Sequence, residues 1–330
     1  MKKITTILAV LALAVTMLFA SCGEKDGSTS ITVGTGGTTG TYYAYTNAVG
    51  SILQKDGDIK FDVVSTGGSV ANINGIDDGD YDMAIVQNDT MINAYNDLDK
   101  DNFKNGAVKS FSVLGEVYSE VVQIVVDGKL KDKVKTLADL KGMRVSVGDV
   151  GSGVYLNAKD LFAAYDIDID KDITQNNLSV GDSADAMKDG KLDAFFFTAG
   201  APTTAITELG TAMDVFILSL EDSVMDSFIA SHKIDGKYEV YSKMPITKTQ
   251  YDFIPEGETV YTIGVTATYI VSSDLDEEVV YKMTKALWEN TDAIAQAHAV
   301  GKGMDIKNAL VTIGNVPVHP GAQKYYDEVK

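Results

Sequence analysis

The sequence predicts an α/β protein built of two lobes, and three observations lead to this fold class. Two blocks of the chain alternate strand-like and helix-like segments, a pattern typical of parallel sheets whose faces are covered by helices. Long β-rich runs separate the two blocks and follow the second one. Three of the strand-like segments also end in clusters of Gly, Ser and Thr. We therefore expect each lobe to be a mixed sheet flanked by helices, with long strands crossing between the lobes.

Both blocks take their expected elements from the spacing of hydrophobic residues. The first block has strands expected at residues 31–33, 59–64 and 81–87 and helices at 42–53, 70–76 and 90–96. The second block has strands expected at 144–147, 194–198 and 215–218 and helices at 154–165, 183–188 and 201–209.

The remaining segments indicate how the two blocks are joined. The long β-rich runs lie at 111–118, 121–126 and 259–271, and the strongest helical spacing follows at 276–288 and 291–299. This order predicts that the chain leaves the first lobe, builds the second and then returns. We expect residues 31–120 and 265–330 to form lobe 1, and residues 121–264 to form lobe 2.

The start of the chain resembles an export signal. Lys2 and Lys3 precede an uncharged run over residues 4–20, and Cys22 follows the small residues at its end. This pattern predicts a lipoprotein signal peptide at 1–21, lipidation of Cys22 and a polar tether at 22–30. The mature protein would then be an extracytoplasmic, membrane-anchored lipoprotein, in the periplasm or on the outer cell surface. A plain signal peptide with an incidental cysteine, or a short membrane anchor, is the alternative.

Composition excludes several classes of partner. The net charge of −19 argues against nucleic acid and against an anionic membrane surface as binding partners. Cys22 is the only cysteine, so the mature chain has no internal disulfide. Its stability therefore has to come from burial of the hydrophobic residues, which make up 45% of the chain.

Three glycine-rich turns, at residues 34–40, 65–69 and 148–153, follow predicted strands and precede predicted helices. Glycine lets a ligand approach the backbone closely, and the first turn of a helix presents unpaired N–H groups with a partial positive charge. In open α/β sheets, ligands bind beyond the carboxyl ends of the strands, where these turns lie. The turns therefore predict a shared cleft that binds a small anionic molecule.

The spacing within these turns excludes two common interpretations. After Gly34 and Gly36, a dinucleotide-binding turn requires glycine where Thr39 stands, and no lysine is placed to complete a phosphate-binding loop. Ser152 is flanked at two residues on either side by valine, where a hydrolase nucleophile elbow has glycine. The turns thus indicate binding of a small molecule rather than its transformation.

No catalytic residue, metal or cofactor is expected. His232, His298 and His319 are scattered and lack partners at the spacing of metal ligands. An enzyme on a similar two-lobed scaffold is a rival hypothesis, but it needs a nucleophile with a base or an acid/base pair. The predicted cleft offers only Asp89 for that role.

The candidate ligand-binding residues lie in the turns and at the ends of the predicted strands. They are Thr35, Gly36, Gly37, Thr38, Tyr42, Tyr43, Ser65, Thr66, Gly67, Gly68, Ser69, Gln87, Asp89, Ser152, Gly153, Thr198 and Gly200. Tyr42 or Tyr43 is expected to face the cleft with its ring and hydroxyl. Asp89 is either a ligand-binding residue or the N-cap of the next helix. Arg144, the only arginine, precedes its strand and is expected at the opposite end, which leaves backbone N–H groups, hydroxyls or a lysine for an anionic ligand.

Ordered motifs run from about residue 31 to residue 326. They include Gly34-Thr35-Gly36-Gly37, Gly40-Thr41-Tyr42-Tyr43, Ser65-Thr66-Gly67-Gly68-Ser69-Val70, Ala84-Ile85-Val86-Gln87-Asn88-Asp89, Leu137-Ala138-Asp139-Leu140-Lys141-Gly142, Gly151-Ser152-Gly153, Asp193-Ala194-Phe195-Phe196, Thr284-Lys285-Ala286-Leu287-Trp288-Glu289-Asn290 and His319-Pro320-Gly321-Ala322. Together they resemble the TAXI type of solute-binding protein of tripartite ATP-independent periplasmic (TRAP) transporters. Members of that family often have threonine and arginine after the Gly-Ser-Gly turn, where this chain has Val154 and Tyr155.

The resemblance implies a two-lobed periplasmic-binding-protein-like fold. It also implies a small organic anion as ligand, either a glutamate-like amino acid or a dicarboxylate, and delivery of that ligand to TRAP transporter membrane subunits. A ligand-sensing lipoprotein that feeds a signalling partner is the alternative, because a docking surface leaves no motif in the sequence.

Overall fold

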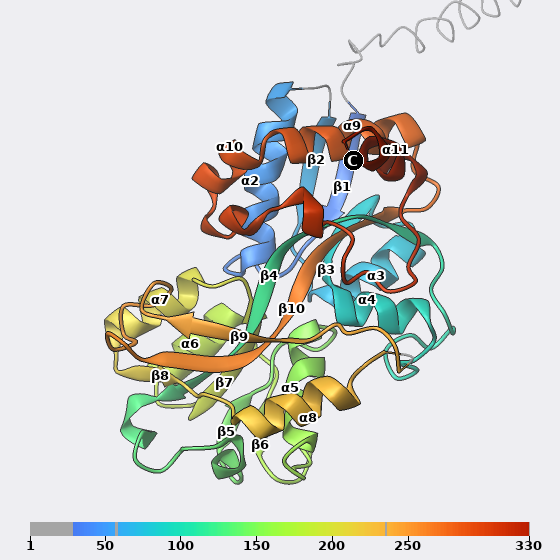
Figure 1. The fold of residues 1–330 in the computed structure, drawn as a ribbon. Coiled ribbons are helices and arrows are strands. Elements are labelled where there is room, and N and C mark those ends of the chain that lie inside the picture. The colour runs from blue at the N-terminus through green and yellow to red at the C-terminus, as the bar shows by residue number, and fades with distance from the viewer. Residues whose placement is uncertain (1–28, 57–58, 235, 330) are drawn as a thin grey trace, which may run out of the picture.

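The computed structural model describes residues 29–56, 59–234 and 236–329, and it has the two-lobed α/β fold that the sequence predicts (Figure 1). The two lobes are stacked in Figure 1 and share one ten-stranded sheet of order β2-β1-β3-β10-β4-β7-β5-β6, with β8 paired to β4 and β9 to β10. The predicted lipidation site, Cys22, and the predicted signal peptide and tether lie outside the described residues. Within the described ranges, no helix combines the length and apolarity needed to span a membrane.

The upper lobe of Figure 1 contains the first three strand-helix pairs. They are β1 (Thr29–Gly34), α2 (Thr41–Asp56), β2 (Ile59–Val64), α3 (Ser69–Asp77), β3 (Met83–Gln87) and α4 (Asn88–Tyr95). β1 pairs in parallel with β2 and β3, so the three strands end at the same edge of the sheet.

The chain returns to this lobe with α9 (Glu277–Glu289), α10 (Thr291–Ala297) and α11 (Pro320–Val329). The short 3-10 helices Ala299–Gly303 and Ile306–Asn308 lie between α10 and α11. The return is fixed by buried polar contacts: the Tyr326 hydroxyl donates to the Leu114 carbonyl at 2.9 Å and accepts from the Trp288 indole N–H, also at 2.9 Å. Segments from both ends of the chain therefore build the upper lobe.

The lower lobe is formed by the middle of the chain. Its elements are β5 (Arg144–Ser146), α5 (Gly153–Ala163), β6 (Thr174–Asn176), α6 (Val180–Lys188), β7 (Ala194–Ala199), α7 (Thr204–Ala212), β8 (Val215–Ile217), α8 (Asp222–Ser231) and β9 (Ser242–Thr247), with 3-10 helices at Gly128–Leu130 and Leu137–Leu140. β5 is parallel to β6 and β7, whereas β7 is antiparallel to β4. The helix expected from residue 201 begins only at Thr204, because Thr203 has an extended backbone and forms its N-cap.

Two long antiparallel strands, β4 (Phe111–Asp127) and β10 (Thr259–Ser272), cross from one lobe to the other (Figure 1). β4 is one strand of 17 residues rather than the two runs expected from the sequence. Ser119 and Glu120 do not interrupt it, because they pair with Thr266 and Val265 of β10. The predicted lobe boundaries at 120/121 and 264/265 fall inside these strands, where Val121 pairs with Gly264.

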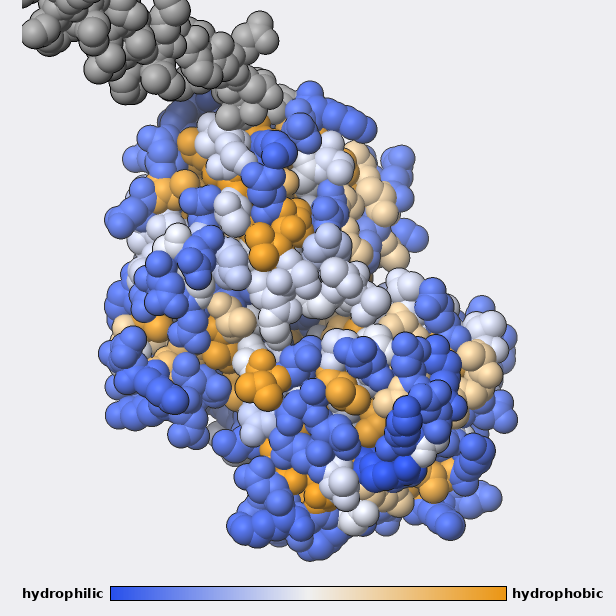
Figure 2. Space-filling view, turned by 180° about the vertical axis from the view of Figure 1, so that it is seen from behind, coloured by the Kyte–Doolittle hydropathy of each residue, from blue (hydrophilic) through white to orange (hydrophobic). Residues whose placement is uncertain are grey.

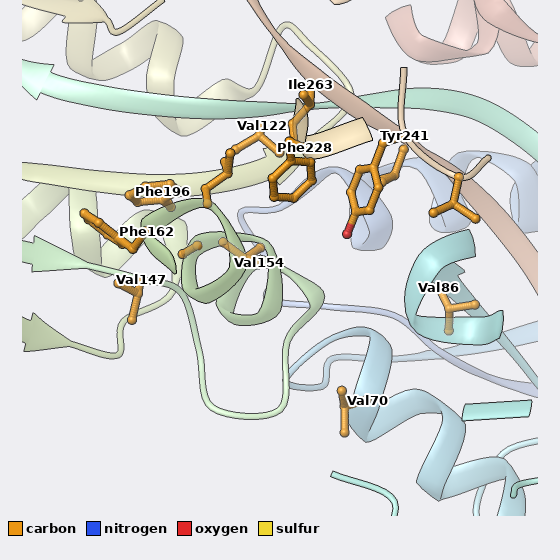
Figure 3. Close-up of a cluster of buried hydrophobic side chains, with 14 of the residues drawn as sticks. Val70, Val86, Val122, Val147, Val154, Phe162, Phe196, Phe228, Tyr241 and Ile263 are labelled. Carbon is orange, nitrogen blue, oxygen red and sulfur yellow. The ribbon is translucent and has the colours of Figure 1, made fainter. Parts of the chain in front are cut away.

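A buried hydrophobic cluster extends from one lobe into the other. Val70 and Val86 belong to α3 and β3 of the upper lobe, while Val154 and Phe162 belong to α5 of the lower lobe (Figure 3). Two further clusters fill the upper lobe around α2, α9 and α11 and the lower lobe around α6 and α7. The lobes are therefore packed against each other as well as joined by strands.

Candidate functional site

A cavity of about 60 Å³ lies between the lobes, and we call it the inter-lobe cavity. In the space-filling view, the waist between the lobes is hollowed and bordered by residues of intermediate hydropathy (Figure 2). The lining residues are Gly36, Gly37, Gly40, Thr41, Tyr42, Gly67, Gly68, Ser69, Gln87, Glu120, Asp149, Ser152, Gly153, Val154, Ser179, Val180, Phe197, Thr198 and Ala199. The volume is far below the roughly 300–1,000 Å³ of pockets for drug-sized ligands. The lobes are therefore close together in this arrangement.

Four helices, α2, α3, α5 and α6, begin at the inter-lobe cavity, and the N-cap residue of α4, Gln87, also lines it. α2, α3 and α4 come from the upper lobe and α5 and α6 from the lower lobe. Ser152 and Ser179 are N-caps, and their hydroxyls accept from the amides of Tyr155 at 3.1 Å and Asp182 at 3.2 Å. The Ala71 amide of α3 donates to the Gly151 carbonyl of the other lobe, and the remaining first-turn amides of α2, α3, α5 and α6 carry a partial positive charge. The cavity wall can therefore donate several hydrogen bonds to an anionic group.

Glycine allows the two lobes to meet backbone to backbone beside the cavity. The amide of Ala71 donates to the carbonyl of Gly151 across the lobes at 3.2 Å. A Cβ atom on Gly67 would lie 3.2 Å from the carbonyl oxygen of Val150, and one on Gly68 would lie 3.4 Å from Ser152. Gly68 also has φ of 112°, which other residues rarely adopt. The turn at 65–69 therefore packs directly on the turn at 148–153.

A buried polar network joins the lobes behind the cavity, and we call it the Asp89 network. Asp89 Oδ2 accepts from Asn157 Nδ2 at 2.9 Å and from the Tyr241 hydroxyl at 2.6 Å. Asn157 Oδ1 accepts from Gln87 Nε2 at 2.7 Å and from the Thr198 hydroxyl at 2.9 Å. Burial raises the pKa of Asp89, while the hydrogen bonds that it accepts from Tyr241, the Thr90 amide and Asn157 lower it in part. The network links β3, α4, α5, β7 and the segment before β9.

Gly153 allows this network to form. A Cβ atom there would lie 1.8 Å from Oε1 of Gln87 and 2.5 Å from its Cδ, so any other residue would overlap the glutamine side chain. Gln87 is itself buried and held by Asn157.

Glu120 of β4 brings a buried carboxyl group to the cavity. Its side chain is 0% exposed, and its Oε2 accepts from the Tyr42 hydroxyl at 2.7 Å. Its Oε1 has no hydrogen-bond partner among the described residues. Burial raises the pKa of Glu120 to about 8, although the bond from Tyr42 acts to lower it. Asp149 also lines the cavity, and burial together with the nearby Asp182 raises its pKa.

The structure brings ten of the sequence-predicted residues together around the inter-lobe cavity. They are Gly36, Gly37, Tyr42, Gly67, Gly68, Ser69, Gln87, Ser152, Gly153 and Thr198. Thr38 instead lines a neighbouring depression of about 330 Å³, which shares Gly40 and Thr41 with the cavity. Tyr43 is half-buried and outside the lining, so Tyr42 is the tyrosine that faces the cavity.

The remaining predicted residues support the turns from outside the lining. The hydroxyl of Thr35 donates to the Val64 carbonyl, and those of Ser65 and Thr66 donate to the carbonyls of Gly36 and Thr35. The carbonyl of Gly200 accepts from Thr41 and Thr203. Asp89 lies within the first turn of α4, whose N-cap is Gln87, so of the two alternatives given for Asp89 the N-cap is wrong.

Sequence reasoning did not find Gly40, Thr41, Glu120, Asp149, Val154, Ser179, Val180, Phe197 and Ala199 as lining residues. One signal was available for Glu120, which is a charged residue within the apolar stretch of β4. Arg144 lies at the amino end of β5 and forms a bidentate pair with Asp193, with Nη2 2.7 Å from Oδ1 and Nε 3.0 Å from Oδ2. No lysine, arginine or histidine lines the inter-lobe cavity, as far as the described residues extend.

Comparisons with known proteins give one family match and several similar structures. The profile of the NMT1-like family matches residues 33–329. The alkanesulfonate-binding protein SsuA from Xanthomonas axonopodis pv. citri, bound to MOPS, is 15% identical with a TM-score of 0.48, covering 90% of this chain and 83% of that chain. A structure described for glutathione import via GshT of Streptococcus mutans is 15% identical with a TM-score of 0.49, covering 84% and 96%. The GluR0 ligand-binding core in complex with L-glutamate is 10% identical with a TM-score of 0.48, covering 84% and 99%.

Proposed function

The chain belongs to the NMT1-like family, and on this premise we propose that it is an extracytoplasmic solute receptor that closes its two lobes on a small polar metabolite. The observation that carries the proposal is the convergence of four helix starts, two from each lobe, on one cavity. Ligand held at this position would contact both lobes at once. Binding would therefore favour the closed arrangement over an open one, because only the closed lobes make all of the contacts.

The proposed solute is a small organic acid, either a glutamate-like amino acid or a dicarboxylate. Helix starts and glycine-rich turns bind carboxylates through backbone N–H groups, without a cationic side chain. Arg144 is engaged by Asp193 at the other end of β5, so the cavity depends on these amides and on a hydroxyl such as that of Ser69, which accepts from the Gln87 amide.

The polar groups at the cavity favour binding over chemical turnover. The hydroxyl of Ser152 donates its proton to the Asp149 carbonyl at 2.7 Å and accepts from the Tyr155 amide as the N-cap of α5. Its proton is therefore not directed toward a general base. Asp89 is enclosed in its network and does not line the cavity.

For delivery, we propose the membrane subunits of a TRAP transporter, on the strength of the ordered motifs that resemble TAXI-type receptors. The proposed chain then consists of a signal peptide at 1–21, a tether at 22–30, and lobes at 31–120 with 265–330 and at 121–264. A sensor for a signalling partner is the alternative. Genes for TRAP membrane subunits beside this gene would support uptake, whereas a sensor-kinase gene in their place would contradict it.

A screen of solutes against the mature protein tests the receptor role. An amino acid or dicarboxylate present at about 100 times its Kd should add about 2.7 kcal/mol to the free energy of unfolding, which raises Tm by several degrees. Differential scanning fluorimetry measures the shift, and small-angle scattering should show a more compact protein if the lobes close further. No shift with any small polar metabolite would contradict the role, and conversion of a bound solute into product would support an enzyme instead.

The anchor is tested separately by Cys22→Ser in the full-length chain. The substitution removes the thiol that receives the lipid, so we expect the protein to move from the membrane fraction to the soluble fraction after cell fractionation. Affinity for the solute should be unchanged, because Cys22 precedes both proposed lobes. If Cys22→Ser stays in the membrane fraction, residues 1–21 act as an uncleaved anchor.

A further inference from the structure

The carboxyl group of Glu120 is placed where a ligand, rather than the protein, would satisfy it. Glu120 lies on β4 opposite Val265 of β10, in the part of the sheet shared by both lobes, and it lines the inter-lobe cavity. Oε2 is engaged by the Tyr42 hydroxyl, whereas Oε1 is buried and has no partner within the part of the chain that the structure describes. Buried polar atoms almost always have a partner, so one is expected for Oε1 in the cavity itself.

The charges around Glu120 determine what kind of partner suits it. The ionisable groups that act on it or share its cavity are Tyr42 of α2, Asp89 of α4, Tyr118 of β4 and Asp149 of the turn before α5. Each of these side chains is neutral when protonated and negatively charged when deprotonated. The cavity lining described above includes no basic side chain. An ionised Glu120 would therefore be an uncompensated buried charge, which is strongly unfavourable unless a cation pairs with it.

We propose that Oε1 of Glu120 accepts a hydrogen bond from an ammonium group of the solute, while the starts of the helices hold the carboxylate of the same solute. The inference rests on the proposed receptor function and narrows it, because it selects zwitterions of the amino-acid class over dicarboxylates. The two halves of the ligand match two features of the cavity: helix starts that attract negative charge, and a carboxyl group that requires positive charge.

This arrangement links binding to a proton. Burial raises the pKa of Glu120 to about 8 in the empty site, so the group is largely protonated at pH 7. A bound ammonium favours the carboxylate and lowers that pKa, so the carboxyl proton leaves to solvent when the solute binds. Affinity should then rise as the pH increases from 6 to 8, by up to about tenfold per pH unit. If a protonated Glu120 instead donated to a carboxylate of the solute, binding would release no proton and would weaken as the pH rises through 8.

Isothermal titration calorimetry on the mature protein tests the proposal with matched probes. The twenty amino acids are titrated beside the acids that lack the amino group, such as glutarate beside L-glutamate. We expect at least one amino acid to bind about 10- to 100-fold tighter than its deaminated counterpart. Titration in buffers of different ionisation enthalpy should show release of up to about one proton. Glu120→Gln should remove the discrimination and the proton release, whereas Glu258→Gln, at an exposed glutamate, should change neither.

Each outcome decides the proposal. If deaminated acids bind as tightly as amino acids, or if the wild-type protein binds an amino acid without releasing a proton, Glu120 is not an ammonium site and the receptor role still stands. If neither class of probe nor any other small metabolite binds, both the receptor role and the role of Glu120 as an ammonium site are wrong. The proton count in the wild-type protein keeps the test valid even if Glu120→Gln folds poorly.

Discussion

Replacement of Gly153 by alanine is expected to reduce solute affinity by about 10- to 100-fold while leaving both lobes folded. The added Cβ atom would lie 1.8 Å from Oε1 of Gln87, far inside van der Waals contact. Gln87 comes from the upper lobe and Gly153 from the lower one, so the overlap arises only when the lobes are closed. Either the closed form is disfavoured, or Gln87 gives up its 2.7 Å hydrogen bond to Asn157. Calorimetric titration with the solute identified by screening measures the loss.

Two further variants separate this steric effect from a general effect of alanine. Gly303→Ala is a matched control, because the nearest contact of its Cβ would be an ordinary 3.9 Å from Tyr118. It should bind the solute as the wild-type protein does. Gln87→Ala removes the side-chain atoms that the added Cβ atom would overlap, so adding Gly153→Ala to Gln87→Ala should cost little further affinity. Equal losses on both backgrounds would show that the overlap is not the cause.

Replacement of Asp89 by alanine should give the largest loss of stability, about 2–4 kcal/mol in the free energy of unfolding. The carboxylate accepts from Asn157 and Tyr241, and both donors are buried. Removing it takes away the acceptor of the buried Tyr241 hydroxyl and one of the two acceptors of Asn157 Nδ2, and it opens a small void between the lobes. Chemical denaturation monitored by circular dichroism measures the change.

A milder variant and a control at an exposed position show how large the loss of unfolding free energy at Asp89 is. Tyr241→Phe removes one donor and leaves Asn157 bound to Asp89, so it should cost only about 1 kcal/mol. Asp132→Ala, at an exposed position, should stay within about 0.5 kcal/mol of the wild-type protein. A loss at Asp89 no larger than that at Asp132 would mean that the network does not stabilise the closed lobes.

Local sequence patterns predict much of this fold because the strands, turns and helices follow each other at short range. The turn at 65–69, for example, is identified by its glycines and hydroxyls, and the structure places it against the turn at 148–153. The long strand β10 was also predictable, since Thr259–Ser272 is rich in β-branched and aromatic residues. The two-lobed arrangement follows from the order of such elements along the chain.

The contacts between the lobes were not predictable in the same way. Asn157 and Tyr241 are ordinary polar residues in their own segments, and only folding brings them to Asp89. Glu120 lies between the β-rich runs at 111–118 and 121–126, and the sequence therefore indicates a break between two strands there. Its burial depends instead on β10 and α2, which are distant in sequence. Such residues owe their roles to tertiary contacts, which hydrophobic spacing does not encode.

The return of the chain to the upper lobe has a consequence for biosynthesis. The ribosome delivers the whole of the lower lobe, from β5 to β9, before it delivers α9 to α11. The upper lobe lacks its buried Tyr326 contacts with Leu114 and Trp288 until α11 emerges. Strand β3 therefore has no β10 to pair with until the intervening lobe has been synthesised, and the sheet of β1 to β3 is completed only then. A nascent chain of this protein can finish its second lobe first and its first lobe last.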